Sequence, residues 1–147
     1  MDKQQEMLSI SEQESISETV LRMVAQFPEM PKGLVPLWQD MPKKEGIGIF
    51  TMQGAAYLSK DILGGFKAQF PFRLLYRSVE TGNSEAIASQ GILEKLSEWL
   101  ENMEYPALTD GRKIEEITRK SPVFLAGKDE AGTVFQCNMN LIYRKEG

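Results

Sequence analysis

The sequence has 147 residues and contains no histidine. Histidine is the most frequent general base in enzymes and a common metal ligand, and both the Ser-His-Asp triad and the Cys-His pair depend on it. These two routes to an activated nucleophile are therefore excluded. Three acidic pairs remain, each expected in a loop, at the start of a strand or on a polar helix face: Glu98 with Glu101, Glu115 with Glu116, and Asp129 with Glu130.

Carboxylates in such places are usually solvated, so the acidic pairs are not expected to be catalytic. Cysteine is almost as scarce as histidine, because Cys137 is the only one. A lone cysteine forms no intrachain disulfide and fits a reducing cytoplasm, and it leaves no structural zinc site within one chain. Cys137 lies in an alternating apolar run and is predicted to be a small core residue. We expect no catalytic residue, no cofactor and no metal.

The sequence also lacks an excess of positive charge, with 17 basic and 21 acidic residues and a net charge of -4. Nucleic acid is therefore not expected as the main partner. A local basic patch is the weaker alternative, and its members would be Arg73, Arg77, Arg112, Lys113, Arg119 and Lys120. No run of 18 apolar residues occurs and the N-terminus is polar, so we expect neither a membrane span nor a secretion signal.

What is present is the composition of a globular domain, with 41% hydrophobic and 26% charged residues. A chain of this length can bury a core without a metal or a disulfide. We predict a frayed lead-in over residues 1–10 and a single domain over residues 11–147.

Two segments have the 3.6-residue spacing of amphipathic helices. The first covers residues 11–27 and ends before Pro28, because proline cannot continue the hydrogen-bonding ladder. The second extends to about residue 102, with Asn83 or Ser84 as its predicted N-cap. The residues between about 27 and 42 are predicted to form an irregular, packed connector that contains Trp38.

The remaining apolar segments are predicted to be strands, at residues 46–52, 55–63, 66–79 and 114–125, followed by a hairpin loop at 127–132 and a closing strand. The order α-β-β-β-α-β-β predicts an α+β fold. Its sheet is expected to be mostly antiparallel, with four to five strands and both helices packed on one face.

Glycine and proline add positional information. Gly46 and Gly48 are predicted to mark a close approach of another backbone segment, and they lack the context of a phosphate-binding loop. Pro71 is expected at a sheet edge, at a bulge or at the start of its strand, and Pro122 at an edge or a bulge, since proline donates no ladder hydrogen bond.

Three segments of the sequence resemble the tail terminator proteins of phages, which are also called minor capsid proteins in prophages of Gram-positive bacteria. They are residues 70–77 (FPFRLLYR), the helical residues 87–100 with their Leu-x-x-Trp-Leu ending, and residues 135–143 (FQCNMNLIY). The similarity extends from about residue 16 to the C-terminus. It implies no catalytic residue.

The resemblance implies a virion protein, assembled in the host cytoplasm, that forms a homo-oligomeric ring, commonly a hexamer. Such a ring binds the end of the tail tube, stops its polymerisation and contacts the head-completion protein. The residues that we assign to a possible subunit or tube interface are Trp38, Pro71, Arg73, Arg77, Arg112, Lys128, Asp129 and Glu130. Two alternatives are a dimeric α+β ligand-binding module and, less favoured, a histidine-free enzyme that uses carboxylates or tyrosines.

Overall fold

The computed structural model describes residues 6–79 and 82–147, and these residues form two helices and a seven-stranded sheet. The elements are α1 (Ile10–Ala25), β1 (Leu37–Trp38), β2 (Gly46–Thr51), β3 (Ala56–Lys60), β4 (Phe66–Ser78), α2 (Asn83–Asn102), β5 (Arg112–Arg119), β6 (Phe124–Asp129) and β7 (Gly132–Lys145). The fold is α+β, as predicted. The sheet is larger than the four to five strands expected.

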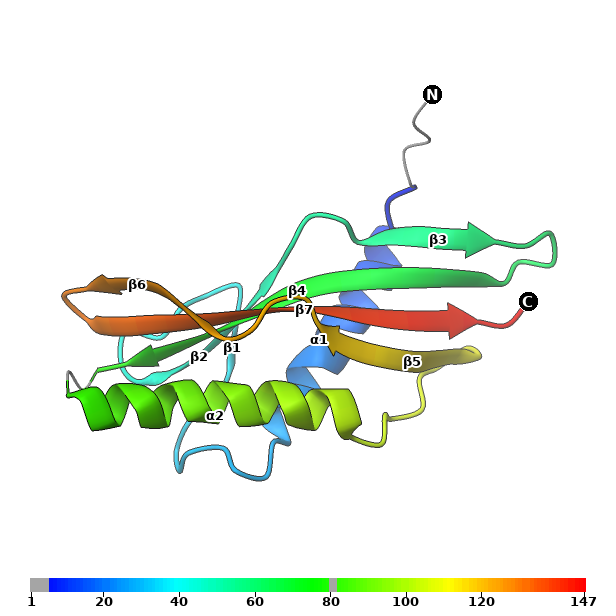
Figure 1. Cartoon of the computed structure of the whole chain (residues 1–147). Helices are drawn as coiled ribbons and strands as arrows, with labels where there is room; N and C mark the ends of the chain where they lie inside the picture. Colours follow the sequence, from blue (N-terminus) through cyan, green and yellow to red (C-terminus); the bar gives the residue numbers. More distant parts are fainter. Residues whose placement is uncertain (1–5, 80–81) are drawn as a thin grey trace.

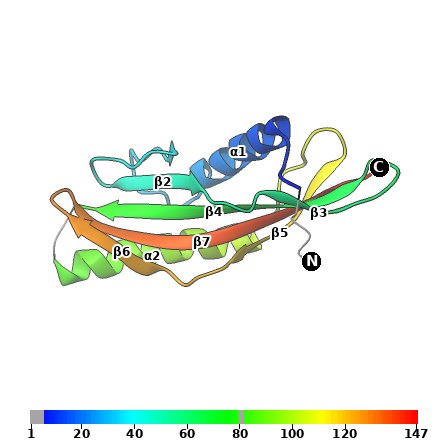
Figure 2. The same ribbon diagram turned by 90° about the horizontal axis from the view of Figure 1, so that it is seen from above.

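Two long strands form the centre of this sheet. β4 and β7 pair antiparallel along their length, from Phe66 opposite Lys145 to Ser78 opposite Thr133. Both run along the long axis of the molecule (Figures 1 and 2). Each has two short strands on its outer side, β2 and β3 beside β4, and β5 and β6 beside β7. The sheet is mixed, because the short strand β1 pairs in parallel with β2.

The outer strands of β7 are separated by a break at residues 120–123. The segment 114–125 was predicted as one strand, but Pro122 falls within it and cannot donate to a ladder. Lys120 N donates to Asn138 O over 2.7 Å, and Asn138 N donates to Ser121 Oγ over 3.0 Å. The segment between β5 and β6 therefore stays bonded to β7. The predicted loop at 127–132 is shorter than expected, since only residues 130–131 lie between β6 and β7.

Pro71 is at neither an edge, a bulge nor the start of its strand. It lies in the middle of β4, opposite Asn140 of β7. On its other side, β2 has ended and β3 has not begun, and Pro71 O accepts from Met52 N over 3.2 Å. Because the N and C=O of one strand residue point to the same side, the missing donor of Pro71 faces this gap. The break is in the neighbouring strands and not in the strand that contains the proline.

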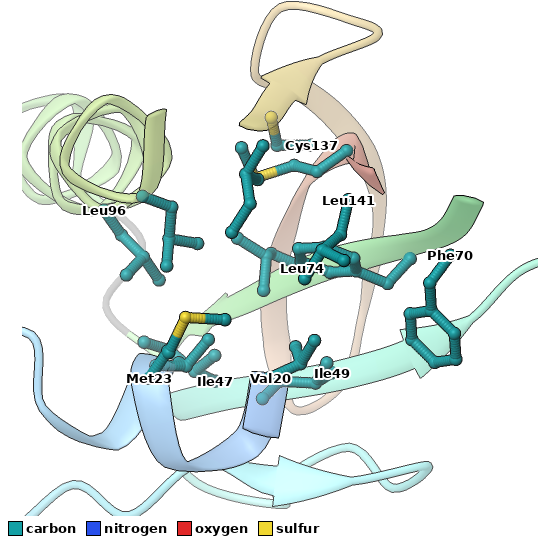
Figure 3. Packing of buried hydrophobic residues seen from close by; sticks show 14 of the residues in the cluster. Val20, Met23, Ile47, Ile49, Phe70, Leu74, Leu96, Cys137 and Leu141 are labelled. Carbon is teal, nitrogen blue, oxygen red and sulfur yellow. The ribbon is translucent and has the colours of Figure 1, made fainter. Parts of the chain in front are cut away.

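Both helices pack on the same face of the sheet. Alternate residues of β4 and β7 point into this core, including Leu74 and Cys137, which are fully buried. Figure 3 shows Val20 and Met23 of α1 and Leu96 of α2 directed toward them. The predicted packing of Cys137 in the core is confirmed.

The predicted lead-in over residues 1–10 differs from the structure at its C-terminal end. Residues 1–5 lie outside the described part of the chain. Tyr57 N donates to Glu6 O over 2.9 Å, and Leu8, which is 3% exposed, donates from its N to Ala55 O. This segment therefore extends the sheet beside β3, and α1 begins directly after it. Ser9 is the N-cap of α1.

The start of α2 also differs from the expectation. Its N-cap is Gly82, and no side chain caps it. Asn83 and Ser84, the predicted caps, lie inside the first helical turn.

Candidate functional site

The face of the sheet opposite the two helices is the candidate site, and we call it the open face. The register of β2, β4 and β7 places the following residues on it: Phe50, Gln69, Pro71, Arg73, Leu75, Arg77, Gln136, Asn138, Asn140 and Ile142. The residues between them on the same strands point into the core, so the alternation of each strand separates the two faces.

One end of the open face is covered by the segment that joins β1 to β2. A Cβ atom added to Gly48 would lie 2.5 Å from Asp40 O, and one added to Gly46 would lie 2.8 Å from Pro42 Cγ. The predicted close backbone approach is therefore confirmed at Gly48, whereas Gly46 is approached by the side chain of Pro42. Arg77 Nε donates to Pro42 O over 2.8 Å and attaches the segment to β4.

Arg77 also joins two predicted interface residues. Its Nη1 lies 2.7 Å from Asp129 Oδ1, across β7, and its side chain is only 11% exposed. The hydrogen bond from Arg77 lowers the pKa of the exposed Asp129 carboxyl. This contact holds the turn between β6 and β7 against β4. The guanidinium of Arg77 is therefore bonded to groups of its own chain. Lys128 and Glu130, beside Asp129, are exposed.

The middle of the open face is polar. Arg73 Cζ lies 5.3 Å from the ring centroid of Phe50, and Gln136 Nε2 donates to Asn138 Oδ1 over 2.8 Å. Asn140 Nδ2 donates to Gln69 Oε1 over 3.4 Å. Together these groups form a surface of amides beside a cation that lies over an aromatic ring.

Two atoms at the centre of this surface are buried without a partner. Arg73 Nε and Asn140 Oδ1 have no hydrogen-bond partner within the described chain. Asn140 is only 8% exposed, so water has little access to it. A buried polar group left without a partner costs about 1–3 kcal/mol, so such groups are rare in a finished structure. At these two atoms, the hydrogen bonds of the open face are incomplete within the described chain.

Two predicted interface residues lie elsewhere. Trp38 is half-buried, and it packs against the core from the parallel strand β1. Arg112 is half-buried, with a side chain that is 12% exposed, because its guanidinium is held by Glu12 of α1. Arg112 Nε lies 2.9 Å from Glu12 Oε1, Nη2 bonds to Oε2, and Tyr143 Oη donates to Oε1 over 2.9 Å.

The structure therefore brings together only part of the predicted set. Pro71 and Arg73 are in the open face, and Arg77 is at its covered end. Sequence reasoning missed Phe50 and Asn140 as members of this site. The sequence does carry a signal for Asn140, because polar residues alternate with core residues along β7, whereas the apolar segment at residues 46–52 carries no such signal for Phe50.

The chemistry of this arrangement is hydrogen bonding. Within the described residues, no group of three or more histidine, cysteine, aspartate or glutamate side chains is placed to hold a metal ion. Burial raises the pKa of the Cys137 thiol, which keeps it protonated. Burial likewise raises the pKa of Tyr143, and its hydrogen bond to Glu12 acts in the same direction. The open face offers amide donors and acceptors and one arginine to a partner.

No family model matches the chain, and no curated protein matches its sequence. A solved structure whose name indicates no function is 14% identical, covers 92% of this chain and 93% of its own, and has a TM-score of 0.41. A similarity at this level supports no functional argument. Neither described helix is long and apolar enough to cross a membrane.

Proposed function

We propose that this chain is a structural protein of virion assembly that acts as a tail terminator. It forms a homo-oligomeric ring, hexameric as in the family that it resembles, caps the tail tube, stops polymerisation and contacts the head-completion protein. It assembles in the cytoplasm of the bacterial host. The observation that carries the proposal is the open face, where the Arg73 guanidinium over the Phe50 ring lies beside the amides of Gln136 and Asn138.

The open face has the properties of a docking surface for a protein. Its strands β4 and β7 are the longest in the sheet, so their positions are fixed by many ladder hydrogen bonds. Amides and arginine bond well to the backbone and side-chain groups of another protein. The tube protein or a neighbouring subunit of the ring is the partner that the family resemblance implies.

The three segments that carry the resemblance fall on one structural unit. Residues 70–77 belong to β4, residues 87–100 to α2 and residues 135–143 to β7. These elements pack together as the centre of the domain, and two of them form the open face. This supports the use of the family as the guide to the partner.

A tube-growth assay tests the proposal. The purified tail-tube protein encoded near this gene is polymerised with and without the full chain, and tube lengths are measured by electron microscopy. We expect shorter, uniform tubes when the chain is present. The variant Arg73→Ala should lose the effect, because it removes the cation from the open face.

The matched control is Arg22→Ala, which makes the same change at an exposed position of α1, on the helical side of the sheet. It should terminate tubes like the unchanged protein. Deletion of the gene from its prophage gives the decisive result. Tails of normal, uniform length in the deletion strain would disprove a terminator function.

A further inference from the structure

The outer edges of the sheet differ in whether their backbone is already bonded. Beside β3, Tyr57 N donates to Glu6 O. Beside β5, Ile117 N donates to Tyr105 Oη over 3.1 Å, and Arg119 N donates to Glu101 Oε2 over 3.1 Å. These two edges are therefore closed by other parts of the chain, as natural proteins commonly do to prevent strand addition.

The edge of β6 is different. All six of its residues are exposed, and within the described part of the chain its ladder bonds go to β7, with a register shift between Leu125 and Gly127. It carries Phe124 and Leu125, which are 37% and 52% exposed. An exposed edge with large apolar side chains is a template for another strand.

The charges around β6 define which strand fits. The apolar residues 123–126 are preceded by Lys120 and followed by Glu130, and both charged residues are exposed. Neither forms an ion pair within the described residues. An antiparallel pairing of two β6 edges brings the end of the segment that carries Lys120 in each copy toward the end that carries Glu130 in the other. A parallel pairing would instead place like charges side by side, which is unfavourable.

We propose that the β6 edge binds a second copy of this chain, antiparallel and about a two-fold axis. The sheet then continues from one subunit into the next, and Phe124 and Leu125 of each copy gain apolar cross-strand neighbours. Because the contact uses the same residues in both copies, it closes in a dimer. A cyclic ring needs a different, head-to-tail contact, so this interface is separate from the ring contact of the proposed function.

Light scattering coupled to size-exclusion chromatography, over a dilution series of the full chain, tests the proposal. We expect the mass of two chains. Leu125→Lys should raise the dissociation constant of the dimer by more than about tenfold, because it places a charge in the apolar centre of the contact. Ile87→Lys is the control, since Ile87 is an exposed apolar residue of α2 at 71%, and it should leave the dimer unchanged.

Reversal of the charges at Lys120 and Glu130 gives a second test, which does not depend on whether the Leu125→Lys variant folds. Lys120→Glu and Glu130→Lys should each weaken the dimer at low ionic strength, and the two changes together should restore it. A monomer at every concentration overturns the proposal, and so does a dimer that Leu125→Lys leaves intact. A six-chain particle insensitive to Leu125→Lys would support the ring while overturning the β6 contact, so the two proposals fail separately.

Discussion

At the scale of single residues, the bonds among Glu12, Arg112 and Tyr143 connect the first helix to the far end of the sheet. The Glu12 side chain is 7% exposed and that of Arg112 is 12% exposed, so the pair is largely shielded from water. Removal of one partner from a buried pair leaves the other charge without compensation. The pair therefore adds a polar attachment of α1 to the sheet, beside its buried apolar residues Ile16 and Val20.

We expect Glu12→Ala to lower the free energy of unfolding by about 3 kcal/mol, because it removes the main partner of the shielded Arg112 guanidinium, which among the described residues keeps only Asp110 Oδ2 at 3.3 Å and Thr109 O at 3.4 Å. Urea denaturation followed by circular dichroism measures the change. Glu14→Ala, at an exposed position of the same helix, should change the stability by less than about 0.5 kcal/mol. Equal effects of the two substitutions would contradict the assigned importance of the buried pair.

The same pair predicts a dependence on pH. The hydrogen bond from Arg112 lowers the pKa of Glu12 below its ordinary value of 4.5, despite the opposing effect of burial. A depressed pKa in the folded state stabilises the protein above the unfolded-state pKa, and this contribution is lost as the pH falls through the folded-state value. Unfolding titrations below pH 5 should show a steeper loss of stability for the unchanged protein than for Glu12→Gln. Parallel curves would refute this origin.

At the scale of elements, the segment folded over β2 depends on the absence of a side chain at Gly48. We expect Gly48→Ala to destabilise the protein by about 1–3 kcal/mol, because the new Cβ collides with the backbone oxygen of Asp40. Gly91 provides the contrast, since a Cβ there meets no atom within 4 Å. Gly91→Ala in the interior of α2 should stabilise the protein by about 0.5–1 kcal/mol. Thermal denaturation should show a lower melting temperature for Gly48→Ala and a higher one for Gly91→Ala than for the unchanged protein.

The elements also show what the sequence can predict. Strict alternation correctly located β4 and β7, because a strand between a core and a polar face must alternate. The position of Pro71 within its strand was not predicted, because a proline indicates only that one backbone donor is missing. The gap that accommodates the missing donor lies between the ends of β2 and β3, which the sequence around Pro71 does not show. The ion pair of Arg112 was likewise not predicted, since its partner Glu12 is distant in the sequence and no local pattern connects them.

At the scale of the whole molecule, stability is expected to be unequal across the sheet. β4 and β7 are bonded on both sides along much of their length, whereas β6 lies at an edge and is exposed throughout. Amide hydrogen exchange should be slowest in β4 and β7 and much faster in β6, because edge strands open without global unfolding. If β6 pairs with a second copy, its exchange should slow as protein concentration rises, and exchange independent of concentration would contradict that pairing.

The position of β7 has a consequence for biosynthesis. This strand follows all the other described elements in the chain, yet it lies between β4 and β5 in the sheet. During translation, β4 and α2 leave the ribosome first, and the inner edge of β4 has no partner until β7 follows. Closing this long-range pairing is intrinsically slower than forming local contacts. A nascent chain stalled before β7 would thus expose the apolar face and edge of β4, which makes it a substrate for chaperones.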